Sequence, residues 1–241
     1  MGPVTLELAL HFVAKDGNID VVARRLTIGK FFNCGQPCIA PDCLIVERGI
    51  KGRLIEQIKK NVQGFYGASV HTSYARIINK NRFQRLIRFL DNTKGENHLW
   101  WRNSEDDLYI APTLVLNVQE GDFCWSVGDE PSRPIHPIMV VEHLAKEGLT
   151  YVKRRYQLLA LYIFSEDRST INHILGNTRS GRVLVNDKLL QFSTTLSPFG
   201  GTGSTDIGSN YHQKSFDTFS HKRSTSTNSR AWTVPTIFAI L

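Results

Sequence analysis

Apolar side chains recur along much of the chain at spacings of three and four residues, the period of an amphipathic helix. In the first such segment, Ile19, Val22, Ala23 and Leu26 follow this spacing, and Asn18 or Asp20 is a candidate cap. The same pattern predicts further helices, at 50–65, 83–90, 140–149 and 169–175.

Other apolar runs are shorter and more continuous, as in strands. Residues 158–164 form an unbroken apolar run between polar residues, which predicts a strand buried on both faces. Shorter β-prone runs lie at 4–8, 44–46, 109–118 and 182–185. The polar or proline-rich segments between them predict loops, at 33–43, 92–107 and 121–137. Strands that alternate with helices predict an α/β fold with a mainly parallel sheet flanked by helices.

Composition sets the broad class of the protein. The 241 residues are 41% hydrophobic and 21% charged, which is enough to bury a sizeable core. No apolar run approaches the roughly 20 residues that span a bilayer, so we predict no transmembrane segment. The first residues lack the basic and apolar regions of a signal peptide, so we expect a cytoplasmic protein.

The net charge of +7 raises the question of an anionic partner. The 29 basic residues are scattered, and no signature of a nucleic-acid-binding module accompanies them. We therefore predict no nucleic-acid partner. The alternative, a basic binding protein without an enzymatic site, rests only on this charge and on the basic segment His221–Arg230.

Four cysteines, Cys34, Cys38, Cys43 and Cys124, are the first chemical candidates. A chain of this length without a signal peptide does not need disulfides. Cys34 and Cys38 have the spacing of one zinc knuckle, but no second pair follows, so we predict no metal site. The remaining alternatives are buried inert thiols or a reactive thiol. Cys38 lies in a loop bent by glycine and proline, which can present a sulfur at the surface of a sheet.

The segment 31–42 reads Phe-Phe-Asn-Cys-Gly-Gln-Pro-Cys-Ile-Ala-Pro-Asp. It resembles the nucleophile loop of the aldehyde dehydrogenase superfamily, and especially its class 3 branch, whose pattern is Phe-x-Asn-x-Gly-Gln-x-Cys-x-Ala-Pro-Asp. The resemblance covers roughly residues 3–223. Further segments similar to class 3 follow in the same order, at 65–67, 76–78, 83–85, 109–113, 159–162, 186–187, 198–203 and 215–221.

The resemblance implies a set of functional residues. Cys38 falls on the catalytic cysteine, which attacks an aldehyde before hydride passes to NAD or NADP. Glu7, in Glu7-Leu8, matches the start of the motif that carries the general base. Glu130 aligns with the glutamate that binds the nicotinamide ribose. The implied partners are an aldehyde substrate and a second subunit, as a homodimer or a dimer with a full-length relative.

The chain also departs from the family pattern. Ala9, Leu10 and His11 replace the Gly-Gly-Lys that follows the Glu-Leu pair, and Pro37 precedes the nucleophile. The family's Rossmann-like cofactor domain lies upstream of the Glu-Leu pair, so we expect it to be missing here. Because the cofactor carries the hydride chemistry, we expect this chain alone to be impaired or inactive. The alternative is a non-catalytic relative that acts as a dimerisation partner.

The resemblance also divides the chain into three parts. Residues 1–197 correspond to the catalytic domain, and 198–223 to a glycine-rich turn with the family's C-terminal segment. Residues 224–241 form a divergent tail.

Overall fold

The protein is built on one seven-stranded sheet. The computed structural model describes residues 8–66, 74–98, 102–118, 122, 134–153, 158–188, 200–201 and 213–225. The strands lie in the order β3-β6-β7-β2-β1-β8-β9. Their bounds are β1 (Leu8–Val13), β2 (Cys43–Glu47), β3 (Glu96–His98), β6 (Thr113–Leu116), β7 (Ile135–Val141), β8 (Leu158–Phe164) and β9 (Ser180–Val185). Every pairing in this sheet is parallel except that of β3 with β6, so the predicted fold class is confirmed.

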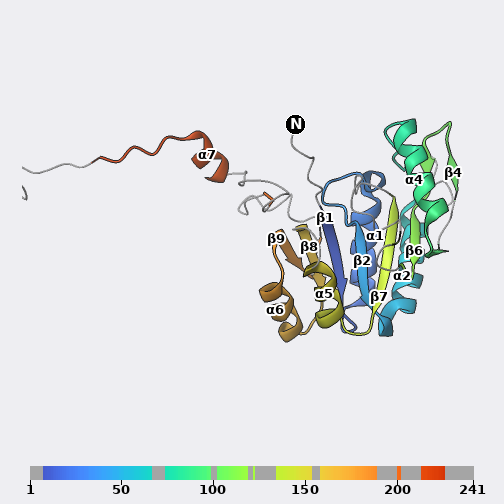
Figure 1. Ribbon diagram of the computed structural model, residues 1–241, viewed down its shortest axis with the longest axis horizontal. Helices are drawn as coiled ribbons and strands as arrows, with labels where there is room; N and C mark the ends of the chain where they lie inside the picture. Colours follow the sequence, from blue (N-terminus) through green and yellow to red (C-terminus); the bar gives the residue numbers. More distant parts are fainter. Residues whose placement is uncertain are drawn as a thin grey trace, which may run out of the picture.

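Helices cover both faces of the sheet (Figure 1). The helices are α1 (Ile19–Phe31), α2 (Lys51–Tyr66), α4 (Lys80–Asn92), α5 (Leu149–Lys153), α6 (Arg168–Asn177) and α7 (Gln213–Phe219), with a π-helical turn η4 (Leu144–Gly148) before α5. Helices α1 and α2 pack against each other on one face. On the opposite face, η4 contacts β1, β2 and β7, and Gly148 lies close to Phe12 and Ile45. No helix of the described segments is long and apolar enough to cross a membrane.

Most predicted elements are confirmed, with small shifts at their ends. Helix α1 begins where its sequence predicts, because the Asn18 side chain accepts a hydrogen bond from the N–H of Val21. The predicted strand at 158–164 is β8, and all seven of its residues are buried. The predicted strand at 44–46 is the centre of β2, and the one at 182–185 is the second part of the edge strand β9.

Three predictions were wrong in part. The helix expected over 140–149 begins only at Leu144, because Val140 and Val141 belong to β7 and pair with β2. Strand β7 also occupies the end of the segment 121–137, which was predicted to be irregular. The expected loop 92–107 contains β3 and the short β4 (Asn103–Ser104), which pairs with β5 (Tyr109–Ile110).

The start of the sheet also differs from the prediction. The strand expected at 4–8 lies mostly outside the described residues, and β1 runs from Leu8 to Val13 instead. Its apolar positions do not alternate because β1 lies between β2 and β8 in the middle of the sheet and is covered on both faces.

The glycine-rich segment that begins at 198 passes close to the edge of the sheet. A Cβ added at Gly181 in β9 would overlap the carbonyl oxygen of Gly200 and lie 2.9 Å from that of Leu159. A side chain at this position therefore forces either β9 or the segment at Gly200–Gly201 to move.

Replacing Gly181 by alanine is expected to lower the free energy of unfolding by about 1–3 kcal/mol, because rigid backbone atoms meet the new methyl group. Urea denaturation measures this change. Gly176→Ala is the matched control, since Gly176 lies in α6 and has open space around its Cα. This control should leave stability unchanged or raise it by up to about 1 kcal/mol. Equal effects of the two variants would contradict the close approach.

Candidate functional site

The loop that carries Cys38 lies at the amino-terminal ends of the central strands. It follows α1 and leads into β2, and it contains a 3-10 turn over Phe32–Gly35. Asn33, Cys34 and Gly35 all have positive φ angles, of 48°, 57° and 69°. This run of left-handed residues costs energy at the two non-glycine positions, and it turns the chain sharply away from the helix axis.

The cysteines of this segment differ sharply in exposure. Cys38 is exposed, whereas Cys34 and Cys43 are buried. Burial raises the pKa of the Cys34 thiol to about 12, and Tyr74 and Arg76 nearby offset only part of this shift. Cys34 is therefore protonated at neutral pH and is a poor nucleophile. Cys38 is the only one of these three thiols that a dissolved reagent can reach directly.

Three buried groups fix the backbone just after Cys38. The Tyr162 hydroxyl donates to the carbonyl oxygen of Ile39 at 3.1 Å, and Lys30 Nζ donates to that of Pro41 at 2.6 Å. The backbone N–H of Asp42 donates to the carbonyl oxygen of Ala9, and Asp42 Oδ2 accepts from the N–H of Ala9, both at 2.7 Å. The loop is thus bonded to β8, α1 and β1, which restricts where Cys38 can lie.

On its outer side the loop is bonded to the segment that precedes α4. Gln36 Nε2 donates to the carbonyl oxygen of Arg76 at 3.0 Å. Arg76 is itself held by Asp107 at 2.8 Å, and its guanidinium lies 5.0 Å from the ring centre of Tyr109. Large apolar side chains are exposed on both segments, with Phe32 59% and Ile78 68% exposed.

Polar side chains gather beneath the loop, between α1 and the sheet. We call His11, Lys30, Asp42, His136, Tyr162 and Lys188 the buried polar cluster, since each is at most 5% exposed. Burial lowers the pKa of His11, and the nearby Lys188, His136 and Lys30 lower it further. Burial also lowers the pKa of Lys188, with a further contribution from Lys30, whereas Asp42 acts in the opposite direction.

The side chains of two members of the cluster lack hydrogen bonds. Neither ring nitrogen of His11 has a partner, and neither does Lys188 Nζ. The Lys188 side chain crosses Gly29 of α1, where any side chain would overlap it. The site predicted from the sequence did not include Lys30, Tyr162 or Lys188. Tyr162 lies inside an apolar run, and a buried lysine has no local sequence signature.

The other predicted site residues, Glu7 and Glu130, lie outside the described residues. The segments that the structure describes bring no three His, Cys, Asp or Glu side chains together for a metal ion. They also do not fit the pyrophosphate of a dinucleotide. The turns that lead into α1, α2 and α6 carry at most one glycine each, and a dinucleotide turn needs several.

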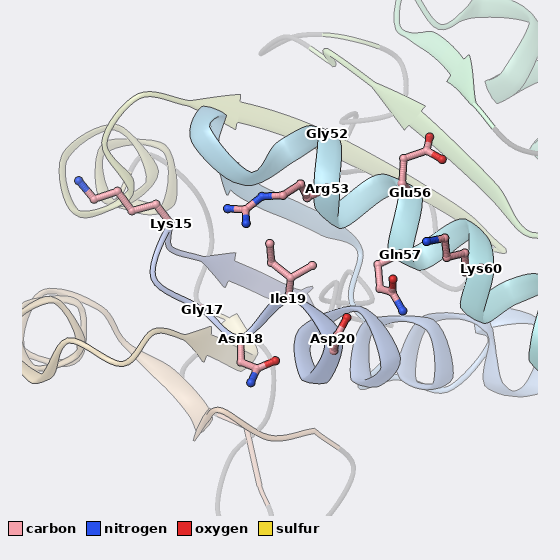
Figure 2. Close-up of a pocket in the computed structure, with 10 residues that line it drawn as sticks. All are labelled: Lys15, Gly17, Asn18, Ile19, Asp20, Gly52, Arg53, Glu56, Gln57 and Lys60. Atoms are coloured by element: carbon pink, nitrogen blue, oxygen red, sulfur yellow. The ribbon is translucent and has the colours of Figure 1, made fainter.

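A surface pocket of about 740 Å³ lies at the other end of the sheet (Figure 2). Its lining residues come from the turn between β1 and α1, from the first residues of α1 and from α2, and they include Lys15, Asp20, Arg53 and Glu56. The turn follows the carboxyl end of β1, whereas the Cys38 loop lies at the amino end, about 20 Å away along the strand. This pocket is therefore separate from Cys38.

Comparisons with known proteins show the family to which the chain belongs. The aldehyde dehydrogenase family matches residues 1–225. The chain is 38% identical over 227 residues to "Aldehyde dehydrogenase, dimeric NADP-preferring" of Rattus norvegicus, covering 92% of this chain and 49% of the relative. It is 38% identical over 230 residues to "Aldehyde dehydrogenase family 3 member A2" of Pongo abelii, covering 92% and 46%.

A solved structure shows the same fold. The substrate-bound state of Staphylococcus aureus AldH superposes with a TM-score of 0.85 at 31% identity, covering 92% of this chain and 50% of that one. The chain thus spans about half the length of these relatives. From the family match and these identities, this chain belongs to the aldehyde dehydrogenase family.

Proposed function

We propose that this chain carries the nucleophile loop of an NAD(P)-dependent aldehyde dehydrogenase and that Cys38 is the nucleophile. The observation that carries the proposal is the exposure of Cys38 on a loop whose backbone is fixed by buried groups, beside two buried cysteines. Family membership and the name of the rat relative, "dimeric NADP-preferring", support this assignment.

The proposed step is the addition of the Cys38 sulfur to an aldehyde. An S–C bond forms, the π electrons of the carbonyl move to its oxygen, and the thiol proton is released. The backbone N–H of Cys38 is the proposed donor to this oxyanion, since Pro37 before it has no N–H. NAD or NADP would supply the hydride acceptor that converts the adduct to a thioester.

Two further roles are proposed for residues outside the described segments. Glu7 would act as the general base that activates the hydrolytic water, and Glu130 would bind the nicotinamide ribose. Because the described turns do not fit a dinucleotide, we propose that the chain alone forms covalent adducts at Cys38 but oxidises aldehydes poorly or not at all.

Acyl transfer from an activated ester tests the nucleophile without a hydride acceptor. Mixing the chain with p-nitrophenyl acetate should release about one nitrophenolate per chain in an initial burst, with the acetyl group on the Cys38 peptide. Mass spectrometry of the acid-quenched protein identifies the modified peptide. The absence of a burst, or acetylation spread evenly over the cysteines, would contradict the proposal.

A non-catalytic role as a dimerisation partner is the second candidate function. Strand β9 forms one edge of the sheet, and its Val183 and Val185 are 37% and 38% exposed. An edge strand with exposed apolar side chains can pair with another chain. The rat relative is named as dimeric. We propose a homodimer, or a dimer with a full-length relative, formed through this edge.

Sedimentation tests the homodimer and the part that β9 plays in it. The chain should sediment as a dimer at micromolar concentration, and Val183→Lys with Val185→Lys should shift it toward the monomer. A monomeric wild-type chain would contradict the homodimer.

A further inference from the structure

We propose that Tyr162 is a positioning residue for Cys38: its buried hydroxyl holds closed the turn on which the nucleophile lies. This inference rests on the proposed function of Cys38. Tyr162 lies in β8, 123 positions from Ile39 along the chain, and its hydroxyl contacts the loop from the side of the sheet.

The peptide unit between Ile39 and Ala40 is bonded at both of its polar ends. Its carbonyl oxygen accepts from the Tyr162 hydroxyl at 3.1 Å, and its N–H donates to the carbonyl oxygen of Pro37 at 2.9 Å. The second bond closes a turn over Pro37–Ala40 that includes Cys38. Fixing this peptide plane therefore fixes the direction in which the Cys38 backbone presents its side chain.

Packing around the Tyr162 ring leaves the hydroxyl little freedom. The ring is fully buried, with the His11 ring edge-on at 5.0 Å and Lys188 Nζ 5.2 Å from its centre. Lys188 Nζ has no hydrogen-bond partner, and burial with the nearby Lys30 lowers its pKa. In the described geometry it is the Tyr162 hydroxyl that reaches the Ile39 carbonyl oxygen.

Packing of β8 in the apolar core does not require the Tyr162 hydroxyl. All seven residues of β8 are buried, and its other members are leucine, alanine, isoleucine and phenylalanine. A phenylalanine at 162 would keep the ring packing against His11 while leaving the Ile39 carbonyl oxygen without this donor. The substitution thus separates the packing of the ring from the hydrogen bond to the loop.

Tyr162→Phe in the full 241-residue chain tests this role, with Tyr151→Phe as the matched control. Tyr151 is a buried tyrosine of α5, on the opposite face of the sheet from α1. Hydrogen exchange of peptides over 37–42 and over β8 is measured under native conditions. The rate of Cys38 alkylation by iodoacetamide and the kinetics of acylation by the ester are measured as well.

Losing this bond should speed exchange in the 37–42 peptide about fivefold, the effect of one net hydrogen bond on local opening. Exchange in β8 should stay within twofold of wild type. The alkylation rate of Cys38 should change, and the acylation rate constant at saturating ester should fall about fivefold with the half-saturating concentration unchanged. The Tyr151→Phe control should match wild type in all four measurements.

Unchanged exchange over 37–42, or equal acceleration in the loop and in β8, would overturn the inference, because either shows that the hydroxyl does not act on the loop specifically. If wild-type Cys38 fails to take up acetyl groups, the proposed function fails. The exchange and alkylation measurements still decide the role of Tyr162 in that case.

Discussion

Cys38→Ala should abolish burst acyl transfer from p-nitrophenyl acetate, with a loss on the order of 10⁴-fold or more, as is typical when a covalent nucleophile is removed. The expectation follows from exposure, because Cys38 is the exposed thiol of the loop while Cys34 and Cys43 are buried. The fold should survive the change, since an exposed side chain contributes little to the core.

Cys34→Ala is the matched control for this experiment. It removes a sulfur four positions away that is protonated at neutral pH because burial raises its pKa to about 12. The variant should therefore retain the acylation burst, although it loses some stability through the buried space it leaves. If Cys34→Ala removed the burst while Cys38→Ala kept it, the assignment of the nucleophile would be wrong.

Lys188→Met should raise the free energy of unfolding by about 1–3 kcal/mol at neutral pH, because it replaces an amine with no hydrogen-bond partner by an unbranched apolar side chain. Lys188 is 5% exposed and lies among other basic groups of the buried polar cluster. Urea denaturation measures the gain. Lys146→Met, at an exposed lysine of η4, is the control and should change stability by no more than about 0.5 kcal/mol.

The same lysine should make wild-type stability depend on pH. Its pKa in the folded state lies well below that of an ordinary lysine, so between these two pKa values the unfolded chain binds a proton that the folded chain does not. Stability from this group therefore rises with pH across that window and is lost as pH falls. Lys188→Met should flatten the dependence of stability on pH below pH 10, and an unchanged slope would contradict a buried lysine with a lowered pKa.

His11 should cause a second decrease in the free energy of unfolding at acidic pH. Its pKa is lowered below 6.5, chiefly by burial, so the unfolded chain takes up a proton first as pH falls. This decline should begin near pH 6.5 and should persist in Lys188→Met.

The sequence predicted the elements whose pattern is local. Strand β8 is an unbroken apolar run, and α2 has a clear helical stripe, so both were predicted within a few residues. Strand β7 was not predicted because prolines such as Pro134 and Pro137 are typical of loops. In the structure Pro137 lies within β7, which pairs with β6 and β2. Tertiary pairing overrides the local signal there.

The candidate site was predictable only where a motif marks it. The pattern around Cys38 identified the loop, but the groups that hold it come from β1, α1 and β8. No local sequence pattern predicts that Tyr162 or Lys188 lies beneath the Cys38 loop, because their contacts are with residues far away along the chain. Glu7 and Glu130 remain predictions from the resemblance.

An aldehyde that adds to the Cys38 sulfur should protect that sulfur from alkylation. The chain is treated with iodoacetamide in increasing octanal, with octanol and the free thiol glutathione as references, and Cys38 alkylation is followed by mass spectrometry. We expect saturable protection of Cys38 at octanal concentrations at least tenfold below those that protect glutathione, and none with octanol. Protection of Cys38 no better than that of glutathione would contradict the claim that this loop is built to bind an aldehyde at its sulfur.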